Sequence, residues 1–252
     1  MLCGACAPSP DRQPTDTALP AAIVTLPLPS RTPAPTASQT SFPSATNSPS
    51  PTFTPVPTLP VKAVIEGIQG SYQQYALSCE ANAAAQLARF FGLALTQREF
   101  QEALPLSKNP ETGFVGQVEG DWGAVPPASY GVHAPPVAAL LREYGLNARA
   151  QSGLSMEDIR QEIAAGRPVM VWVIGGVRTG RPVLFTAPDG SVVTVAAYQH
   201  TVLVIGYGPD YFTFLDGKQE YHRSINQFSE SWKVLGNMAV TVVAPVLLPE
   251  LD

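Results

Sequence analysis

Proline is concentrated at one end of this chain: of its 26 prolines, 14 lie in residues 1–60 of 252. Thr, Ser, Pro and Ala make up the long runs of that segment, which has only four charged side chains: Asp11, Arg12, Asp16 and Arg31. Such a segment has too few large apolar side chains to offset the entropy lost on ordering. We therefore predict a disordered spacer over residues 7–60, locally extended as polyproline II, and a folded domain over residues 61–252.

The first six residues, MLCGAC, have the small and aliphatic side chains expected before a lipid-modified bacterial cysteine. The positive start and apolar run of a complete secretion signal are absent. Ser/Thr/Pro-rich stalks are typical of chains outside the cell. We therefore expect residues 1–6 to be a signal remnant with a possible lipobox, and the protein to be extracellular or on the cell surface. A membrane tether through lipidated Cys6 is one alternative, and free secretion with incidental Cys3 and Cys6 is the other.

Composition limits the classes of function. The formal net charge of −5 argues against a nucleic-acid binder that depends on neutralising phosphates. The spacing of Cys and His matches no metal site, so we expect neither a metal nor another cofactor. The expected partner is a peptide or protein substrate, and the expected oligomeric state is a monomer.

Cys79 is the only cysteine of the predicted domain, so it has no partner there for a disulfide. A lone thiol in an exported chain indicates a reactive cysteine, although a small buried core residue is the alternative. High helix propensity from Cys79 to Phe91, with Ser78 as N-cap and Gly92 after the end, places the thiol in the first turn of a helix. A helix N-terminus favours the thiolate form of a cysteine.

Helical patterns dominate the first part of the domain and strand patterns the second. A short strand is predicted at Val61–Ile68. Three more helices are predicted: one that starts at Thr96 with a capping box of Thr96 and Glu99, one at Val137–Tyr144, and one at Met156–Ala165 that is capped by Ser155. Strands are then predicted over the following ranges, with a short helix at Ser224–Trp232: Pro168–Ile174, Pro182–Thr186, Ser191–Tyr198, His200–Tyr207, Tyr211–Leu215 and Asn237–Val243. The fold class is therefore α+β, with an N-terminal helical part and a C-terminal, mostly antiparallel sheet.

A predicted hairpin brings a histidine and an aspartate together. His200 begins one strand, Asp216 ends the next, and a Gly-Pro turn joins them. Since the start of one hairpin strand lies beside the end of the other, the Asp216 carboxylate is placed to fix the tautomer of the His200 ring. The other two histidines, His133 and His222, are expected to be a packing residue and a solvated residue.

Four sequence blocks carry a resemblance to a known family: L-S-C-E-A around Cys79, Y-G-V-H-A-P-P, Q-H-T-V-L-V-I-G-Y from Gln199, and F-L-D-G ending at Gly217. Together they resemble the papain-like cysteine peptidases of family C39, and specifically their exported, stand-alone branch. The founding members process bacteriocins after a double glycine. The resemblance covers about residues 70–243 and implies a papain-like fold. Ser78-Cys79-Glu80 departs from the founding pattern, which puts cleavage after double glycine in doubt.

The resemblance implies a catalytic triad of Cys79, His200 and Asp216, with Gln73 in the oxyanion hole; the adjacent Gln74 is the alternative. The implied reaction is peptide hydrolysis through a covalent acyl-enzyme. Two alternatives stay open: an amidase or transpeptidase that uses the same triad on cell-wall or other amides, and an inactive relative that binds peptides.

Three other residues near these blocks have weaker signals. Glu80, in the first helical turn, is expected to stabilise the helix dipole and to take no part in catalysis. Trp122 and Tyr130, in a long Gly- and Pro-rich loop, are placed to line a substrate groove or to pack the loop.

Overall fold

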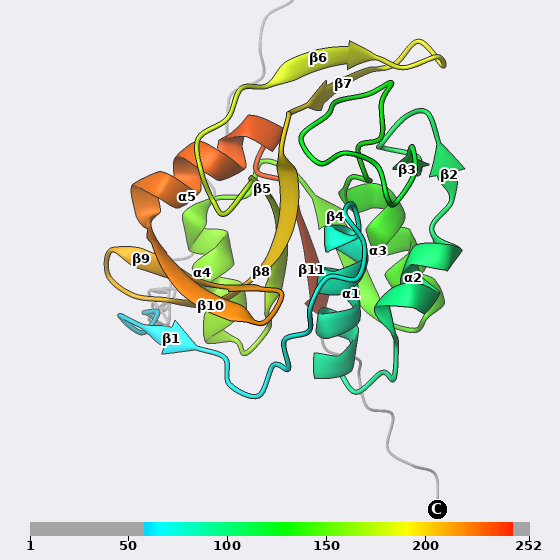
Figure 1. Cartoon of the computed structure of the whole chain (residues 1–252). Helices are drawn as coiled ribbons and strands as arrows, with labels where there is room; N and C mark the ends of the chain where they lie inside the picture. The colour runs from blue at the N-terminus through cyan, green and yellow to red at the C-terminus, as the bar shows by residue number, and fades with distance from the viewer. Residues whose placement is uncertain (1–57, 244–252) are drawn as a thin grey trace, which may run out of the picture. The chain divides into compact units, whose positions relative to one another are not determined.

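The structure, a computed structural model, describes residues 58–243 (Figure 1). The predictions for residues 1–6, for all but the last residues of the spacer, and for residues 244–252 lie outside the described part. Within residues 58–243, no helix is long and apolar enough to cross a bilayer.

The described part contains five α-helices and one short 3-10 helix, η1 (Lys233–Leu235). The α-helices are α1 (Cys79–Phe90), α2 (Gln97–Ala103), α3 (Ala134–Glu143), α4 (Met156–Ala164) and α5 (Ile225–Trp232). Each lies within a few residues of a predicted helix. α2, α4 and α5 begin with complete capping boxes on Thr96, Ser155 and Ser224.

The main sheet has seven strands, with the order β10-β9-β8-β5-β11-β4 and with β1 paired to β8. These strands are β1 (Ala63–Val64), β4 (Asn147–Gln151), β5 (Val169–Ile174), β8 (Gln199–Tyr207), β9 (Tyr211–Asp216), β10 (Gln219–Ser224) and β11 (Ala239–Val243). All pairings within this sheet are antiparallel. Two small sheets stand apart: β2 (Leu106–Ser107) with β3 (Phe114–Val115), and β6 (Val183–Thr186) with β7 (Val192–Val195).

Helices cover both faces of the main sheet, with α1, α2 and α3 on one side and α4 and α5 on the other (Figure 1). The strands alternate between two cores as the two-residue period requires. In β8, Leu203 and Ile205 face the α1 side, whereas Val202 and Val204 face α4 and α5. Because β5 and β8 are buried on both faces, their sequences are nearly continuous apolar runs rather than alternating ones.

Three predictions about individual elements are wrong in detail. Ser78 precedes α1, but its side chain makes no cap; its Oγ donates to Tyr75 O and accepts from Gln97 Nε2, at 3.1 and 2.8 Å. The strand predicted over residues 61–68 is reduced to β1, since only two residues pair with the end of β8. β4 and β10 were not predicted, because the edge strands of the sheet carry the polar sequences N-A-R-A-Q and Q-E-Y-H-R-S.

Candidate active site

Cys79 occupies the first position of α1, as the sequence predicted. Its side chain is buried, and its Sγ donates a hydrogen bond to Glu80 Oε2 over 3.2 Å. Burial raises the pKa of the thiol well above its usual value, and the adjacent Glu80 raises it further. The backbone and hydroxyl of Thr201, which lie at the sulfur, act in the opposite direction. The resting sulfur is therefore a thiol that needs help to ionise.

Glu80 lies inside the protein, although its sequence position indicated only a stabilised helix start. Its side chain is 1% exposed. Oε1 accepts hydrogen bonds from Val132 N at 3.0 Å and from Gln199 Nε2 at 2.5 Å. Burial raises the pKa of this carboxyl, and these bonds only partly oppose the rise. Glu80 thus connects the nucleophile's helix to the loop at residues 130–132 and to the strand that carries His200.

His200 and Asp216 meet across the β8–β9 hairpin, where the sequence placed them. His200 Nε2 lies 2.8 Å from Asp216 Oδ1, and Tyr221 OH donates to Asp216 Oδ2 over 3.2 Å. Burial opposes ionisation of Asp216, but the hydrogen bond and charge of His200, with Tyr221 and Arg223, outweigh it and hold the pKa of Asp216 below its usual value. An ionised Asp216 accepts from Nε2–H, which leaves the Nδ1 of His200 as the nitrogen for proton transfer.

The histidine and the thiol come from elements that pack against each other. α1 contacts β8, and Thr201, the residue after His200, reaches the Cys79 sulfur. β9 pairs with β8 only from Leu203 onward, so His200 and Thr201 lie beyond the β8–β9 pairing. Among the described residues no hydrogen bond joins Sγ to the His200 ring, because the thiol is directed at Glu80. The catalytic role of this trio stays a prediction.

Gln73, the predicted oxyanion-hole residue, lies in the loop before α1. Its Nε2 donates to the backbone oxygens of Tyr75 and Ala76, at 2.6 and 2.9 Å. The neighbouring Gln74 is exposed. Both amide protons of Gln73 are therefore used within its own loop, and at least one must be released for the amide to bind an oxyanion.

A hollow of about 440 Å³ lies next to His200, with the residues Trp122, Ile174, Gly175, Gly176, Arg178, Thr179 and Tyr198 around it. The Trp122 and Tyr198 rings are 48% and 52% exposed and meet edge to face, with centroids 5.2 Å apart. The Trp122 ring centroid is 6.3 Å from that of His200, and its Nε1 donates to Gln199 O over 3.2 Å. Tyr198 has a left-handed backbone, with φ of 60°. Two partly exposed aromatic rings therefore border this hollow close to the candidate base.

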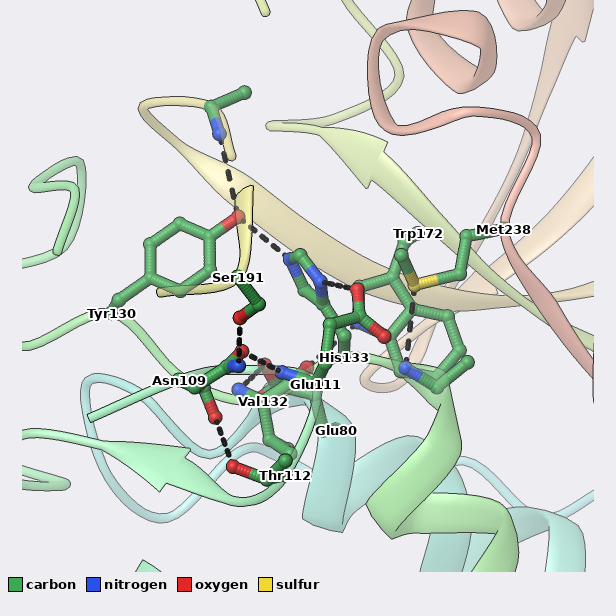
Figure 2. Close-up of polar contacts among 12 residues, drawn as sticks. Glu80, Asn109, Glu111, Thr112, Tyr130, Val132, His133, Trp172, Ser191 and Met238 are labelled. Carbon is green, nitrogen blue, oxygen red and sulfur yellow. Dashed lines mark hydrogen bonds and ion pairs between the residues drawn. The ribbon is translucent and has the colours of Figure 1, made fainter. Parts of the chain in front are cut away.

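Tyr130 does not line this hollow: it is 2% exposed and belongs to a buried network around His133 (Figure 2). His133 Nδ1 lies 2.6 Å from Glu111 Oε1, and His133 Nε2 lies 3.2 Å from Tyr130 OH. Tyr130 OH also accepts from Ala196 N over 3.3 Å. His133 is therefore a packing residue that holds the loop at residues 109–133 against the strands. His222 is exposed, as expected, and contacts Thr213 Oγ1 at 3.0 Å.

The sequence reasoning missed Glu80 and Gln199 as parts of the site. The available signal was their position: an acidic residue directly after the domain's lone cysteine, and an amide directly before its candidate base. Because glutamate in a first helical turn commonly stabilises the helix dipole, the sequence alone does not distinguish a buried Glu80 from an exposed one.

Three solved structures are similar to this chain, and the first of them supports the fold. A protein from Bacillus anthracis designated a C39-like peptidase is 20% identical, with a TM-score of 0.64 over 72% of this chain and 97% of that one. The peptidase domain of Streptococcus ComA, a bifunctional ABC transporter of a quorum-sensing pathway, is 14% identical, with a TM-score of 0.43 over 70% and 98%. A cysteine protease of Carica candamarcensis is 15% identical, with a TM-score of 0.39 over 73% and 99%. No curated protein matches the chain.

The helix-borne cysteine packed on an antiparallel sheet thus has the α+β fold of the Bacillus anthracis C39-like peptidase. The model of the peptidase C39-like family matches residues 68–240, and the chain belongs to that family.

Proposed function

We propose that this protein is an active cysteine peptidase that hydrolyses peptide bonds through Cys79, His200 and Asp216. The observation that carries the proposal is the 2.8 Å contact of His200 Nε2 with Asp216 Oδ1, on a strand that packs against α1 and whose next residue, Thr201, reaches the Cys79 sulfur. That contact fixes the ring in the tautomer that a nucleophile–base pair needs.

In the proposed reaction the Cys79 thiolate attacks the carbonyl carbon of the scissile bond. His200, as the imidazolium, gives its Nδ1 proton to the leaving amine, and a thioester to the acyl half of the substrate remains. His200 then takes a proton from a water molecule, whose oxygen attacks the thioester. The acid leaves, and the thiolate–imidazolium pair is restored.

The oxyanion of each tetrahedral intermediate needs donors at the start of α1. Cys79 N is in the first turn, where backbone N–H groups have no helical partner. Gln73 supplies a second donor when its amide turns away from Tyr75 O and Ala76 O. The resting bonds of Gln73 predict that this donor is recruited on substrate binding.

The hollow beside His200 is the proposed place for the leaving side of the peptide. The leaving amine takes its proton from His200, so the residue that carries this amine lies on the His200 side of the scissile bond. Trp122 and Tyr198 offer that residue an apolar, pre-ordered surface. We also propose that the enzyme acts outside the cell, held at the surface by Cys6 or released.

The test is a peptide library with proteomic identification of the cleavage sites. We expect cleavage by the native chain, none by Cys79→Ala, and unchanged cleavage by a control in which Cys3 and Cys6 are alanine. Iodoacetamide should label Cys79 and stop turnover. Cleavage by Cys79→Ala at the native rate would refute the mechanism.

The second candidate, a peptide-binding protein without turnover, is favoured by one observation. Burial and Glu80 raise the pKa of the Cys79 thiol well above its usual value, and a thiol is a poor nucleophile. This candidate predicts peptide binding that survives Cys79→Ala, together with no cleavage by the native chain. Calorimetric titration with library peptides distinguishes the two.

A further inference from the structure

The side chain of Glu80 is divided between two tasks. Its bonds to Val132 N and Gln199 Nε2 both end at Oε1, and they fix the carboxyl in place. Its other oxygen, Oε2, faces Cys79 Sγ at 3.2 Å (Glu80 and Val132 are drawn in Figure 2). A carboxyl that needed only to anchor the helix would have no reason to present its second oxygen to the reacting sulfur.

The proximity of the two groups creates an electrostatic conflict. Cys79 and Glu80 are both buried, so water screens their charges poorly. A thiolate beside a carboxylate would place two negative charges 3.2 Å apart. Like charges at such a distance in a buried site do not both ionise, and one proton stays with the pair. The nucleophile can form only if this proton is on Glu80.

The groups around Cys79 and Glu80 do not remove this conflict between their charges. On the loop side, Tyr130 lies near both groups, but burial raises the pKa of its hydroxyl far above its usual value, so it stays neutral. His133 lies beyond Tyr130 and faces Glu111. On the β8 side, the neutral Gln199 faces Glu80 and Thr201 faces the sulfur, while the His200 ring is engaged with Asp216.

We propose that Glu80 is a fourth catalytic residue, which takes the thiol proton of Cys79 and holds it while the thiolate reacts. The Sγ–H bond breaks, its electron pair stays on sulfur, and an O–H bond forms at Oε2. The pair carries one negative charge before and after the transfer. The new carboxylic acid donates its O–H back to the thiolate and so stabilises it.

This step rests on the proposed function and leaves the His200 chemistry intact. His200 enters the reaction as the imidazolium, with a proton from solvent already on Nδ1; it gives this proton to the leaving amine and recovers one from the attacking water. When the thioester breaks, sulfur leaves as a thiolate that again meets a neutral Glu80. The proton therefore stays on Oε2 through acylation and deacylation, and no second negative charge is created in the buried site.

Glu80→Gln is the informative variant. Its amide oxygen accepts the bonds of Val132 N and Gln199 Nε2, and its amide nitrogen stands where Oε2 faces the sulfur. The variant keeps the anchor and a neutral donor but cannot take a proton. Urea unfolding checks that the fold is retained, and iodoacetamide serves as the probe because it reads the thiolate without any peptide substrate.

The first measurement is the number of protons released per Cys79 alkylated, in unbuffered, mildly acidic solution, because burial raises the pKa of the Glu80 carboxyl and favours retention of the proton there. Cys3 and Cys6 are replaced by alanine, so that Cys79 is the only thiol. We expect about one proton fewer from the native Glu80 protein than from Glu80→Gln, because Glu80 keeps the proton that the sulfur loses. Equal release from the two proteins would overturn the proposal.

The second measurement is the alkylation rate at pH 7. We expect Glu80→Gln to react within about threefold of the native protein, since the thiolate meets a neutral donor in both. If Glu80 were a permanent anion, its removal would lower the thiol pKa by about 1–3 units and raise the rate about tenfold or more. Such a rise would also overturn the proposal. Neither measurement uses a peptide. An absence of peptide cleavage would therefore refute the proposed function, while proton release and the alkylation rate would still test the role of Glu80.

Discussion

The buried network around His133 gives a stability prediction that the structure makes quantitative (Figure 2). We propose Tyr130→Phe, which removes one oxygen from a ring that is 2% exposed. That oxygen accepts from Ala196 N at 3.3 Å and contacts His133 Nε2 at 3.2 Å. His133 donates its Nδ1–H to the Glu111 carboxylate, so its Nε2 accepts the hydrogen bond of the Tyr130 hydroxyl. The substitution therefore leaves two buried polar groups without partners.

Each group left in this way costs about 1–3 kcal/mol of stability. Both bonds are long, so we use the lower half of that range, about 1–2 kcal/mol for each group, and expect the free energy of unfolding to fall by about 2–4 kcal/mol. With a urea dependence of about 2 kcal/mol per molar, the middle of the usual range, the midpoint of unfolding should fall by about 1–2 M.

The assay is equilibrium unfolding in urea, followed by tryptophan fluorescence. The matched control is Tyr72→Phe, which removes a hydroxyl from an exposed ring and should change the free energy of unfolding by less than about 0.5 kcal/mol. A Tyr130→Phe loss as small as that of the control, with an unchanged slope, would show that the network does not hold the loop in place.

Three further predictions concern the site and its surroundings. Asp216→Asn should keep kcat/KM within about tenfold of native, because Tyr221 OH can accept from the new amide N–H and so keep the amide oxygen on the His200 ring. Asp216→Ala should lower kcat/KM about 10²–10⁴-fold, and equal losses for the two variants would contradict this reasoning. Trp122→Ala should lower kcat/KM about 10–200-fold for peptides with a large apolar residue on the leaving side, and it should leave the rate of Cys79 alkylation by iodoacetamide unchanged. A drop in both kcat/KM and the alkylation rate would place the indole in the catalytic step. Gly123→Ala should lower the free energy of unfolding by at least about 1 kcal/mol more than Gly92→Ala. Both glycines have a left-handed backbone, but only a Cβ at position 123 would lie 2.4 Å from the Tyr198 ring; urea unfolding of the two variants measures the difference.

Most of the fold was predictable because the buried elements carry strong local signals. β5 and β8 are apolar runs of strand length, and α2, α4 and α5 begin with capping boxes that the sequence shows directly. The edge strands β4 and β10 gave no such signal, since one side of each faces no other strand and their residues are mostly polar. Which helix covers which face of the sheet depends on long-range packing and is not readable from local pattern.

The same division holds for the site. The meeting of His200 and Asp216 follows from hairpin geometry alone, and the placement of Cys79 follows from helix propensity. The burial of Glu80 does not, because it depends on Val132 N and Gln199, which lie 52 and 119 residues away in the sequence. A first-turn glutamate looks the same in sequence whether it faces water or a sulfur atom.

The distance in sequence between the parts of the site also determines when it can exist. His200 follows Cys79 by 121 residues, which take about 6–24 s to synthesise at about 5–20 residues per second. During that interval a growing chain has its reactive thiol but neither β8 nor β9 to hold a base against it. β8 pairs with β9 and β5, and β5 in turn pairs with β11, so this part of the sheet is complete only when almost the whole domain has been made. Under the proposed function, a chain made in this order has no complete catalytic site, and so cleaves neither itself nor neighbouring nascent chains, until its sheet is complete.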